Sequence, residues 1–140
     1  LSRICNSEDI VIGTPVSGRE HPDLDGIVGM FVNTLALRNF PRADLKFIEF
    51  LDSVRDKTLQ CFDHQNYQFE DLIEDLSPTR DLGRSPIFDV MLAFQNFSSE
   101  TLTIPDLKLE KYEPSVTKSK FDLTLLANES EGELRLSFNY

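Results

Sequence analysis

The segment from His21 to Gly26 has the spacing HxxxDG, the sharpest catalytic motif that this sequence contains. A histidine can act as a general base near neutral pH, and Asp25 could orient its surroundings. The same residues also suit a polar surface loop, because Pro22 and Gly26 both favour turns. Short motifs often match by chance, so the pattern alone favours the surface loop.

Cys61 and His64 lie three residues apart, near the end of a predicted helix. A catalytic cysteine needs a setting that favours its thiolate, with a base within hydrogen-bond reach. Cys61 instead falls on the apolar face of that helix, where a small buried residue is the usual outcome. The two cysteines and two histidines are too scattered for zinc ligands, so the sequence predicts no metal site.

Residues 13–18 have the GxxxxG spacing of a phosphate-binding loop. Such a loop needs a lysine for phosphate oxygens and a hydroxyl for magnesium, but Arg19 and Glu20 occupy those positions. No helix is predicted to follow, so an ordinary turn after a strand is favoured. Arg80 and Arg84 could contact a ligand phosphate, although such arginines are usually paired with internal carbonyls and carboxylates.

The amino-acid composition limits the classes of protein to which this chain can belong. The chain has 140 residues, 40% of them hydrophobic and 27% charged, which suits the core of one domain or part of one. A net charge of −10 argues against a nucleic-acid partner, and no apolar run approaches the roughly 20 residues of a membrane span. Two distant cysteines and the lack of a signal segment favour a cytoplasmic setting. The first residue is not methionine, so we expect a fragment of a longer chain.

Hydrophobic periodicity predicts one α+β unit over residues 1–140, with a mixed β-sheet and helices on one side. Strands are expected over residues 10–12, 27–37, 87–94, 107–110, 121–125 and 134–140, and the last two should form a hairpin. An amphipathic helix capped by Asp44 should run to about Asp63, followed by a short helix over residues 69–76. The polar residues 64–70 between these helices are expected to bond to free backbone groups at the helix ends.

Three segments resemble motifs of the condensation domains of nonribosomal peptide synthetases. Residues 28–38 (VGMFVNTLALR) are similar to (I/V)GxFVNTxxxR, and residues 64–70 (HQNYQFE) to HQ-x-Y-x-FE, with Gln68 in place of proline. Residues 80–87 (RDLGRSPI) are similar to RDxSRxPL, with Gly83 and Ile87 as departures. The residues singled out in these motifs are Gly29, Phe31, Val32, Asn33, Thr34, Arg38, His64, Gln65, Phe69, Glu70, Arg80, Asp81, Arg84 and Pro86.

The resemblance implies a fold and an activity. Condensation domains join aminoacyl or peptidyl groups that carrier domains hold as thioesters on 4′-phosphopantetheine arms, and the acceptor amine attacks the donor thioester to form an amide. Their two halves resemble chloramphenicol acetyltransferase and enclose a tunnel, and this chain resembles only the C-terminal half. The family's catalytic HHxxxDG lies in the other half. Because no His-His pair occurs here, we predict no catalytic residue and no bound cofactor in this chain.

The implied partners are the N-terminal half of the domain, the carrier domains and the adjacent synthetase domains. The family places a connecting loop at the His21 segment, with Glu20 where the first catalytic histidine would stand. Thr14, Ser17 and Asn33 are expected near the seam between the halves and are candidate tunnel contacts. The alternative for Asn33 is that it bonds only to backbone.

Two other functions stay open. The chain could be a non-catalytic module that binds a carrier domain, with Arg80 and Arg84 facing an acidic carrier. It could also be an intact small acyltransferase that uses coenzyme A, with His21 as the base. If one half of the domain is missing, an apolar surface is exposed, which predicts dimerisation of the isolated chain.

Overall fold

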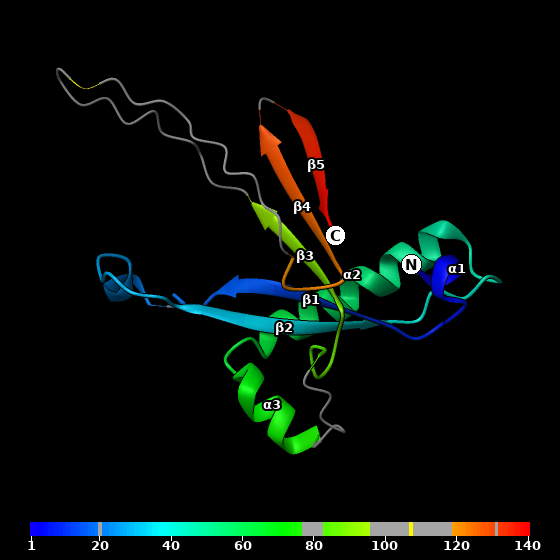
Figure 1. Ribbon diagram of the computed structural model, residues 1–140, viewed down its shortest axis with the longest axis horizontal. Helices are drawn as coiled ribbons and strands as arrows, with labels where there is room; N and C mark the ends of the chain where they lie inside the picture. The colour runs from blue at the N-terminus through cyan, green and yellow to red at the C-terminus, as the bar shows by residue number, and fades with distance from the viewer. Residues whose placement is uncertain (20, 77–82, 96–106, 108–118, 131) are drawn as a thin grey trace.

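The computed structural model describes residues 1–19, 21–76, 83–95, 107, 119–130 and 132–140. Within these ranges the strands are β1 (Ile10–Ser17), β2 (Val32–Asn39), β3 (Val90–Gln95), β4 (Leu123–Ser130) and β5 (Glu133–Asn139). The helices are α1 (Ser2–Cys5), the short 3-10 helix η1 (Pro22–Leu24), α2 (Phe47–Asp63) and α3 (Phe69–Leu76). Figure 1 shows α2 behind the sheet and α3 beyond the edge formed by β2.

The described strands form one mixed sheet in the order β2-β1-β3-β4-β5. The outer pairs, β1–β2 and β4–β5, are antiparallel, whereas the inner pairs, β1–β3 and β3–β4, are parallel. Parallel neighbours need a long crossover, and the chain that includes α2 and α3 supplies it before β3. The predicted α+β class with a mixed sheet and helices is confirmed, as is the hairpin at the C-terminal end of the chain.

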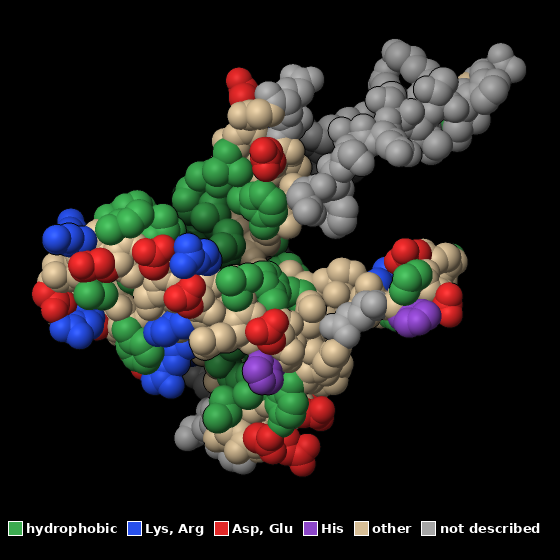
Figure 2. Space-filling view, turned by 180° about the vertical axis from the view of Figure 1, so that it is seen from behind, with side chains coloured by type: hydrophobic (Ala, Val, Ile, Leu, Met, Phe, Trp, Pro, Cys, Tyr) green, Lys and Arg blue, Asp and Glu red, His purple; other side chains and the backbone are tan. Residues whose placement is uncertain are grey.

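α2 packs against β2 on the sheet face where Asn33 and Leu35 lie, and those two residues are almost completely buried. Its outer surface carries mixed charges, among them the pair Arg55–Asp52 at 3.2 Å. Figure 2 shows these charges, with hydrophobic side chains gathered beside them over the β4–β5 end of the sheet. None of the helices in the described ranges is long and apolar enough to cross a membrane.

The predicted cap of α2 by Asp44 is wrong. The carboxylate of Asp44 accepts a hydrogen bond from Arg42 Nε at 3.0 Å and is therefore engaged before the helix begins. The Glu49 carboxylate in the first turn accepts the backbone N–H of Lys46 at 3.1 Å instead. An acidic residue in this position also interacts favourably with the helix dipole.

The core of the opposite sheet face is built on Phe88, which is 4% exposed. Its ring centroid lies 5.5 Å from those of Phe69 and Phe121, so three distant segments meet in one aromatic cluster. The Phe88 ring also covers Gly13, where an added Cβ would overlap the ring atoms. β1 therefore needs glycine at this position because the ring occupies the space of a side chain.

Two strand boundaries differ from the predictions at Gly13 and Ile27. β1 continues through Pro15 to Ser17, although glycine and proline predicted an end at residue 12. Proline is tolerated there because β1 pairs with β3 only around Gly13, so the strand is nearly an edge beyond that residue. The strand predicted from Ile27 begins only at Val32. Residues 27–31 belong to a loop, in which Arg19 donates hydrogen bonds to the carbonyl oxygens of Ile27 and Gly29.

The second half of the chain shows smaller differences. The strand predicted from residue 87 begins at Val90, because Phe88 turns into the aromatic cluster first. β4 begins at Leu123 rather than at residue 121, and the strand predicted over residues 107–110 lies mostly outside the described residues. Gly132 follows β4 with a φ of 79°, a conformation that glycine adopts without strain.

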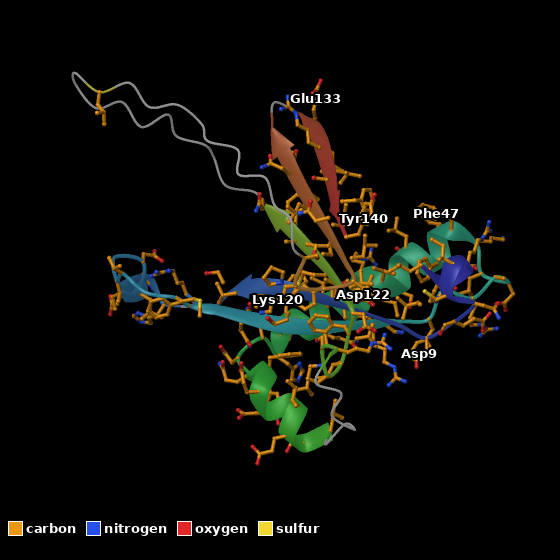
Figure 3. All side chains as sticks on the ribbon, viewed as in Figure 1. Asp9, Phe47, Lys120, Asp122, Glu133 and Tyr140 are labelled. Atoms are coloured by element: carbon orange, nitrogen blue, oxygen red, sulfur yellow. The ribbon has the colours of Figure 1, made fainter. Side chains whose placement is uncertain are left out.

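An apolar strip follows β5. Leu134, Leu136 and Phe138 alternate along one face of the strand, and each is more than half exposed. Figure 3 shows Glu133 at the hairpin end of the strand and Tyr140 at the other end. Dimerisation through an exposed apolar surface stays a prediction.

Candidate functional site

Asn33 connects β2 to the junction between α2 and α3. Its amide nitrogen donates to the carbonyl oxygens of Gln65 at 2.7 Å and Tyr67 at 2.9 Å. Its amide oxygen accepts the backbone N–H groups of Thr34 at 2.8 Å and Phe69 at 3.2 Å. The residue is 7% exposed, so water could not replace these bonds freely. All four partners are backbone groups, which is the alternative that the sequence left open for Asn33.

Further hydrogen bonds stabilise the junction between α2 and α3. The Tyr67 hydroxyl donates to the Asp75 carboxylate in α3, and this hydrogen bond is the main cause of a raised pKa of Tyr67. His64 Nδ1 lies 2.9 Å from the carbonyl oxygen of Gln60 in the last turn of α2. His64 thus bonds to a backbone group in the last turn of α2, as predicted, whereas Tyr67 bonds to a side chain of α3 and the link to the sheet comes from Asn33.

A hollow of about 650 Å³, here called the motif pocket, lies between α3, the sheet and residues 83–88. Phe88, Met91 and Phe121 give it an apolar wall, and Lys120 lies on its border. The three segments that resemble family motifs all contribute to its lining, through Val32, Thr34, Phe69, Glu70, Arg84 and Pro86. Segments separated by tens of residues in sequence therefore form one local structure.

Arg84 is held by Asp89 at the border of the motif pocket. Its Nε donates to Asp89 Oδ1 at 3.1 Å, and a second nitrogen donates to the other carboxylate oxygen. This two-pronged geometry is typical of strong arginine–carboxylate pairs. The arrangement favours the bracing interpretation of Arg84 over phosphate contact, whereas Arg80 and Asp81 lie outside the described residues.

A second hollow, of about 610 Å³, lies at the end of β1 and is here called the β1 pocket. Thr14 and Ser17 are part of its lining, together with the aromatic side chains of Phe31, Phe62 and Phe94. The Ser17 hydroxyl oxygen also accepts the backbone N–H of Arg19 at 3.4 Å. Two candidate tunnel residues, Thr14 and Ser17, therefore share an apolar hollow at one end of the sheet.

Among the described residues, the linings of the motif pocket and the β1 pocket include neither His21 nor Cys61. The His21 side chain is 69% exposed, and its Nδ1 accepts the backbone N–H of Asp23 at 3.3 Å in the η1 loop. Cys61 lies on α2, and partial burial raises the pKa of its thiol. A raised thiol pKa disfavours the thiolate that nucleophilic catalysis needs. The described geometry thus favours the surface-loop interpretation of His21 and disfavours Cys61 as a nucleophile.

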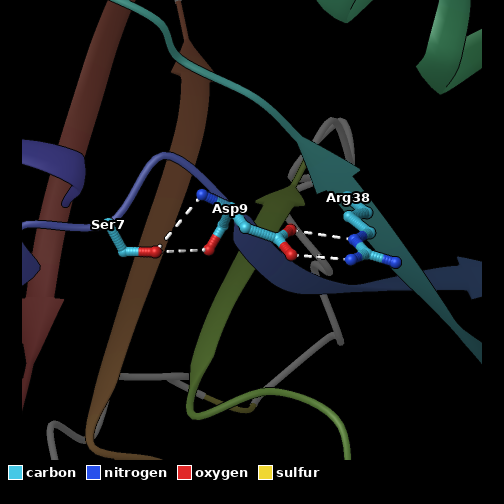
Figure 4. A network of polar contacts seen from close by, with 3 residues as sticks. All are labelled: Ser7, Asp9 and Arg38. Atoms are coloured by element: carbon cyan, nitrogen blue, oxygen red, sulfur yellow. Dashed lines mark hydrogen bonds and ion pairs between the residues drawn. The ribbon is translucent and has the colours of Figure 1, made fainter.

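An ion pair that the sequence did not reveal joins Asp9 to Arg38 (Figure 4). Arg38 Nε donates to one carboxylate oxygen at 2.8 Å, and a terminal nitrogen donates to the other at 2.6 Å. The Arg38 hydrogen bonds are the main cause of a lowered pKa of Asp9, and the Lys57 charge lowers it further. Because the two residues are 29 positions apart, no local pattern could have predicted the pair.

We expect Asp9→Asn to remove an acid-sensitive contribution to stability. The Asp9 pKa is lower in the folded chain than the value of about 3.9 expected for the unfolded chain. Its contribution is therefore complete above that unfolded value and disappears as the pH falls through the folded pKa. Urea unfolding from pH 7 to pH 3 should show the difference between parent and Asp9→Asn shrinking below about pH 4. A difference that stays constant over this range would contradict the assignment, and Arg38→Lys should weaken it only partly.

Solved structures define the class of fold. A crystal structure of a four-domain nonribosomal peptide synthetase bound to AMP and glycine matches 95% of this chain with a TM-score of 0.81 and 25% identity, over 11% of its own length. The condensation domain from Monacolin K polyketide synthase matches 96% of the chain with a TM-score of 0.78, over 32% of its length; at 21% identity it supports the fold alone. The fold is therefore the chloramphenicol-acetyltransferase-like fold of condensation domains.

Sequence relatives agree with this class. The condensation-domain family model matches residues 1–140, and the chain belongs to that family. It is 48% identical over 140 residues to surfactin synthase subunit 2 of Bacillus subtilis (strain 168), and 44% identical over 142 residues to tyrocidine synthase 3 of Brevibacillus parabrevis. All of the chain is covered in both cases, but it spans only 4% and 2% of those relatives' lengths. The resemblance in its three motifs is thus confirmed at the level of the family.

Proposed function

We propose that this chain is the C-terminal half of a condensation domain in a nonribosomal peptide synthetase, and that the whole domain forms amide bonds between carrier-bound aminoacyl or peptidyl thioesters. The observation that carries the proposal is the meeting of the three motif segments. Asn33 of the first bonds to the backbone of the second, and both share the motif pocket with Arg84 of the third.

In this proposal the chain positions reactants rather than moving protons. Thr14 and Ser17 contribute polar groups to one wall of the tunnel, where the β1 pocket supplies apolar surface. Such a wall holds two thioester-linked groups at short range and excludes water that would hydrolyse them. The catalytic histidines come from the N-terminal half, and 4′-phosphopantetheine belongs to the partner carrier domains. A cytoplasmic setting fits this role.

The exposed position of His21 supports this proposal over the coenzyme A acyltransferase. An acyl-transfer base must reach a bound substrate, and the described contacts of His21 lie within its own loop. Carrier binding without catalysis is the other alternative. It differs from the proposal in one outcome, since such a module would bind carriers but would not complete an active domain.

We expect no amide product when this chain alone is mixed with two loaded carrier domains. The same chain within its intact condensation domain should give product, because the base-bearing half is then present. Single-turnover product formation, followed by mass spectrometry of the carrier-bound peptide, measures both. Turnover by the chain alone that His21→Ala abolishes would overturn the proposal, whereas an intact domain that binds carriers without turnover would favour the binding module.

A further inference from the structure

Arg19 connects the end of β1 to the loop that leads to β2. One terminal nitrogen of its guanidinium donates to the carbonyl oxygen of Leu24, and the other donates to those of Ile27 at 2.8 Å and Gly29 at 3.3 Å. The planar guanidinium has several donors in a fixed geometry, whereas a lysine would offer a single ammonium group. Arg19 therefore restrains a loop that projects beyond the paired ends of β1 and β2 (Figure 1).

The Arg19 side chain also holds the ring of Phe31. Its guanidinium carbon lies 4.3 Å from the ring centroid, within the range of a cation–π contact. The backbone of Phe31 is held as well, because its carbonyl oxygen accepts the N–H of Gly18. A Cβ at position 18 would lie 2.7 Å from that oxygen, so glycine permits the close approach. The ring and the backbone of Phe31 are both held by the residues that follow β1.

Arg19 and Phe31 both line the β1 pocket. Its aromatic wall is formed by Phe31, Phe62 and Phe94, which come from three separate segments. Phe62 belongs to α2 and Phe94 to β3, so regular structure positions their rings. Phe31 lies in neither a helix nor a strand, and the contact with Arg19 positions its ring instead.

We propose that Arg19 is a positioning residue for amide formation, which acts by holding the Phe31 ring as a wall of the β1 pocket; the inference rests on the proposed function. In that function the β1 pocket belongs to a tunnel that holds thioester-linked groups and excludes water. Without Arg19 the ring would leave the wall, so a bound thioester would be held less well and water would enter. Water would then attack the thioester carbonyl carbon and break the C–S bond. A proton from the water passes to the sulfur, and a free acid and the carrier thiol form in place of an amide.

Product formation by the intact condensation domain with two loaded carrier domains tests the proposal. Arg19→Gln should raise the KM for at least one loaded carrier about fivefold while kcat changes by less than about twofold, because binding is lost rather than chemistry. The ratio of hydrolysed thioester to amide, measured by mass spectrometry, should also rise about fivefold as water enters. Arg19→Lys should recover only part of both effects, since it keeps a cation at the ring but loses the fork of donors.

Arg55→Gln is a matched control. Arg55 also pairs with carboxylates, those of Asp52 at 3.2 Å and Asp56 at 3.3 Å, but it lies on the charged surface of α2. Its loss should leave the KM and the hydrolysis ratio unchanged. If Arg19→Gln leaves both values unchanged as well, the proposal is refuted.

Phe31→Leu separates positioning from a general loss of stability. It should reproduce the rise in KM and in hydrolysis, and Arg19→Gln should add little to it, because a residue that acts through another loses its effect when the other is absent. An undiminished effect of Arg19→Gln in the Phe31→Leu background would overturn the proposal. Urea unfolding shows which variants are folded, and Arg19→Lys with Phe31→Leu provides the same comparison if Arg19→Gln does not fold.

Hydrogen exchange distinguishes a failure of this inference from a failure of the proposed function. The backbone amides of residues 24–31 should exchange about tenfold faster in Arg19→Gln than in the parent, whether or not the domain makes amides. Equal exchange rates would show that Arg19 does not restrain the loop. An intact parent domain that forms no amide would instead refute the proposed function and leave the restraint of Phe31 in place.

Discussion

Gly13→Ala is expected to destabilise the intact domain by about 1–5 kcal/mol. The new Cβ would overlap atoms of the Phe88 ring, so the ring must move. Phe88 is 4% exposed and packs against Phe69 and Phe121, so a shift of its ring disturbs both contacts. The upper limit is the loss of the Phe88 packing altogether. Urea unfolding at pH 7 measures the change in free energy.

A matched control exists in the same chain. None of the described residues lies within 4 Å of the position that a Cβ would take at Gly26, so Gly26→Ala should change stability by less than about 0.5 kcal/mol. The cause can be checked with Phe88→Ala, because Gly13→Ala should cost far less when the ring is already absent. Equal effects of Gly13→Ala and Gly26→Ala would show that the ring yields easily and would refute this account.

Local periodicity was sufficient to predict the two longer helices, α2 and α3, and the C-terminal hairpin, but not the short helices α1 and η1. The apolar spacing along α2 and α3 and the alternation along β5 depend on residues that are close in sequence. These patterns can therefore be recognised without knowledge of the fold. The same approach failed at Pro15 and Ile27. Pro15 can belong to a strand because the pairing between β1 and β3 is confined to Gly13. Ile27 belongs to a loop because Arg19 donates a hydrogen bond to its carbonyl oxygen. Both causes lie in tertiary contacts.

The site was predictable only in part for the same reason. The three motif segments could be recognised from sequence, but their meeting around one pocket could not be derived from spacing. Arg19, Phe88 and the Asp9–Arg38 pair were missed as organising features. The partners of Phe88 are brought together by the sheet, and Asp9 reaches Arg38 only because β1 and β2 pair in one register. Local patterns in the sequence do not predict such contacts.

Asn33→Leu is expected to destabilise the domain by about 2–5 kcal/mol and to loosen the junction between α2 and α3. Leucine has a similar volume but leaves the carbonyl groups of Gln65 and Tyr67 and the N–H groups of Thr34 and Phe69 without this partner. Each buried polar group left unpaired costs about 1–3 kcal/mol, which exceeds the gain from the added apolar surface. Unfolding in urea gives the free energy, and hydrogen exchange at residues 65–69 reports the loosening.

Asn39 provides the control on the same strand, since its buried side-chain oxygen has no hydrogen-bond partner within the described residues. Asn39→Leu should therefore be nearly neutral, and an equal loss of stability at both positions would show that any leucine on β2 is disruptive.

Asn33→Asp keeps the shape of the side chain but replaces its amide with an acid, so it tests the need for a hydrogen-bond donor. A carboxylate at position 33 would face the oxygens of Gln65 and Tyr67, which raises its folded pKa above the unfolded value of about 3.9. The penalty of this variant should consequently grow as the pH rises above about 4, because only the protonated acid can donate to those oxygens.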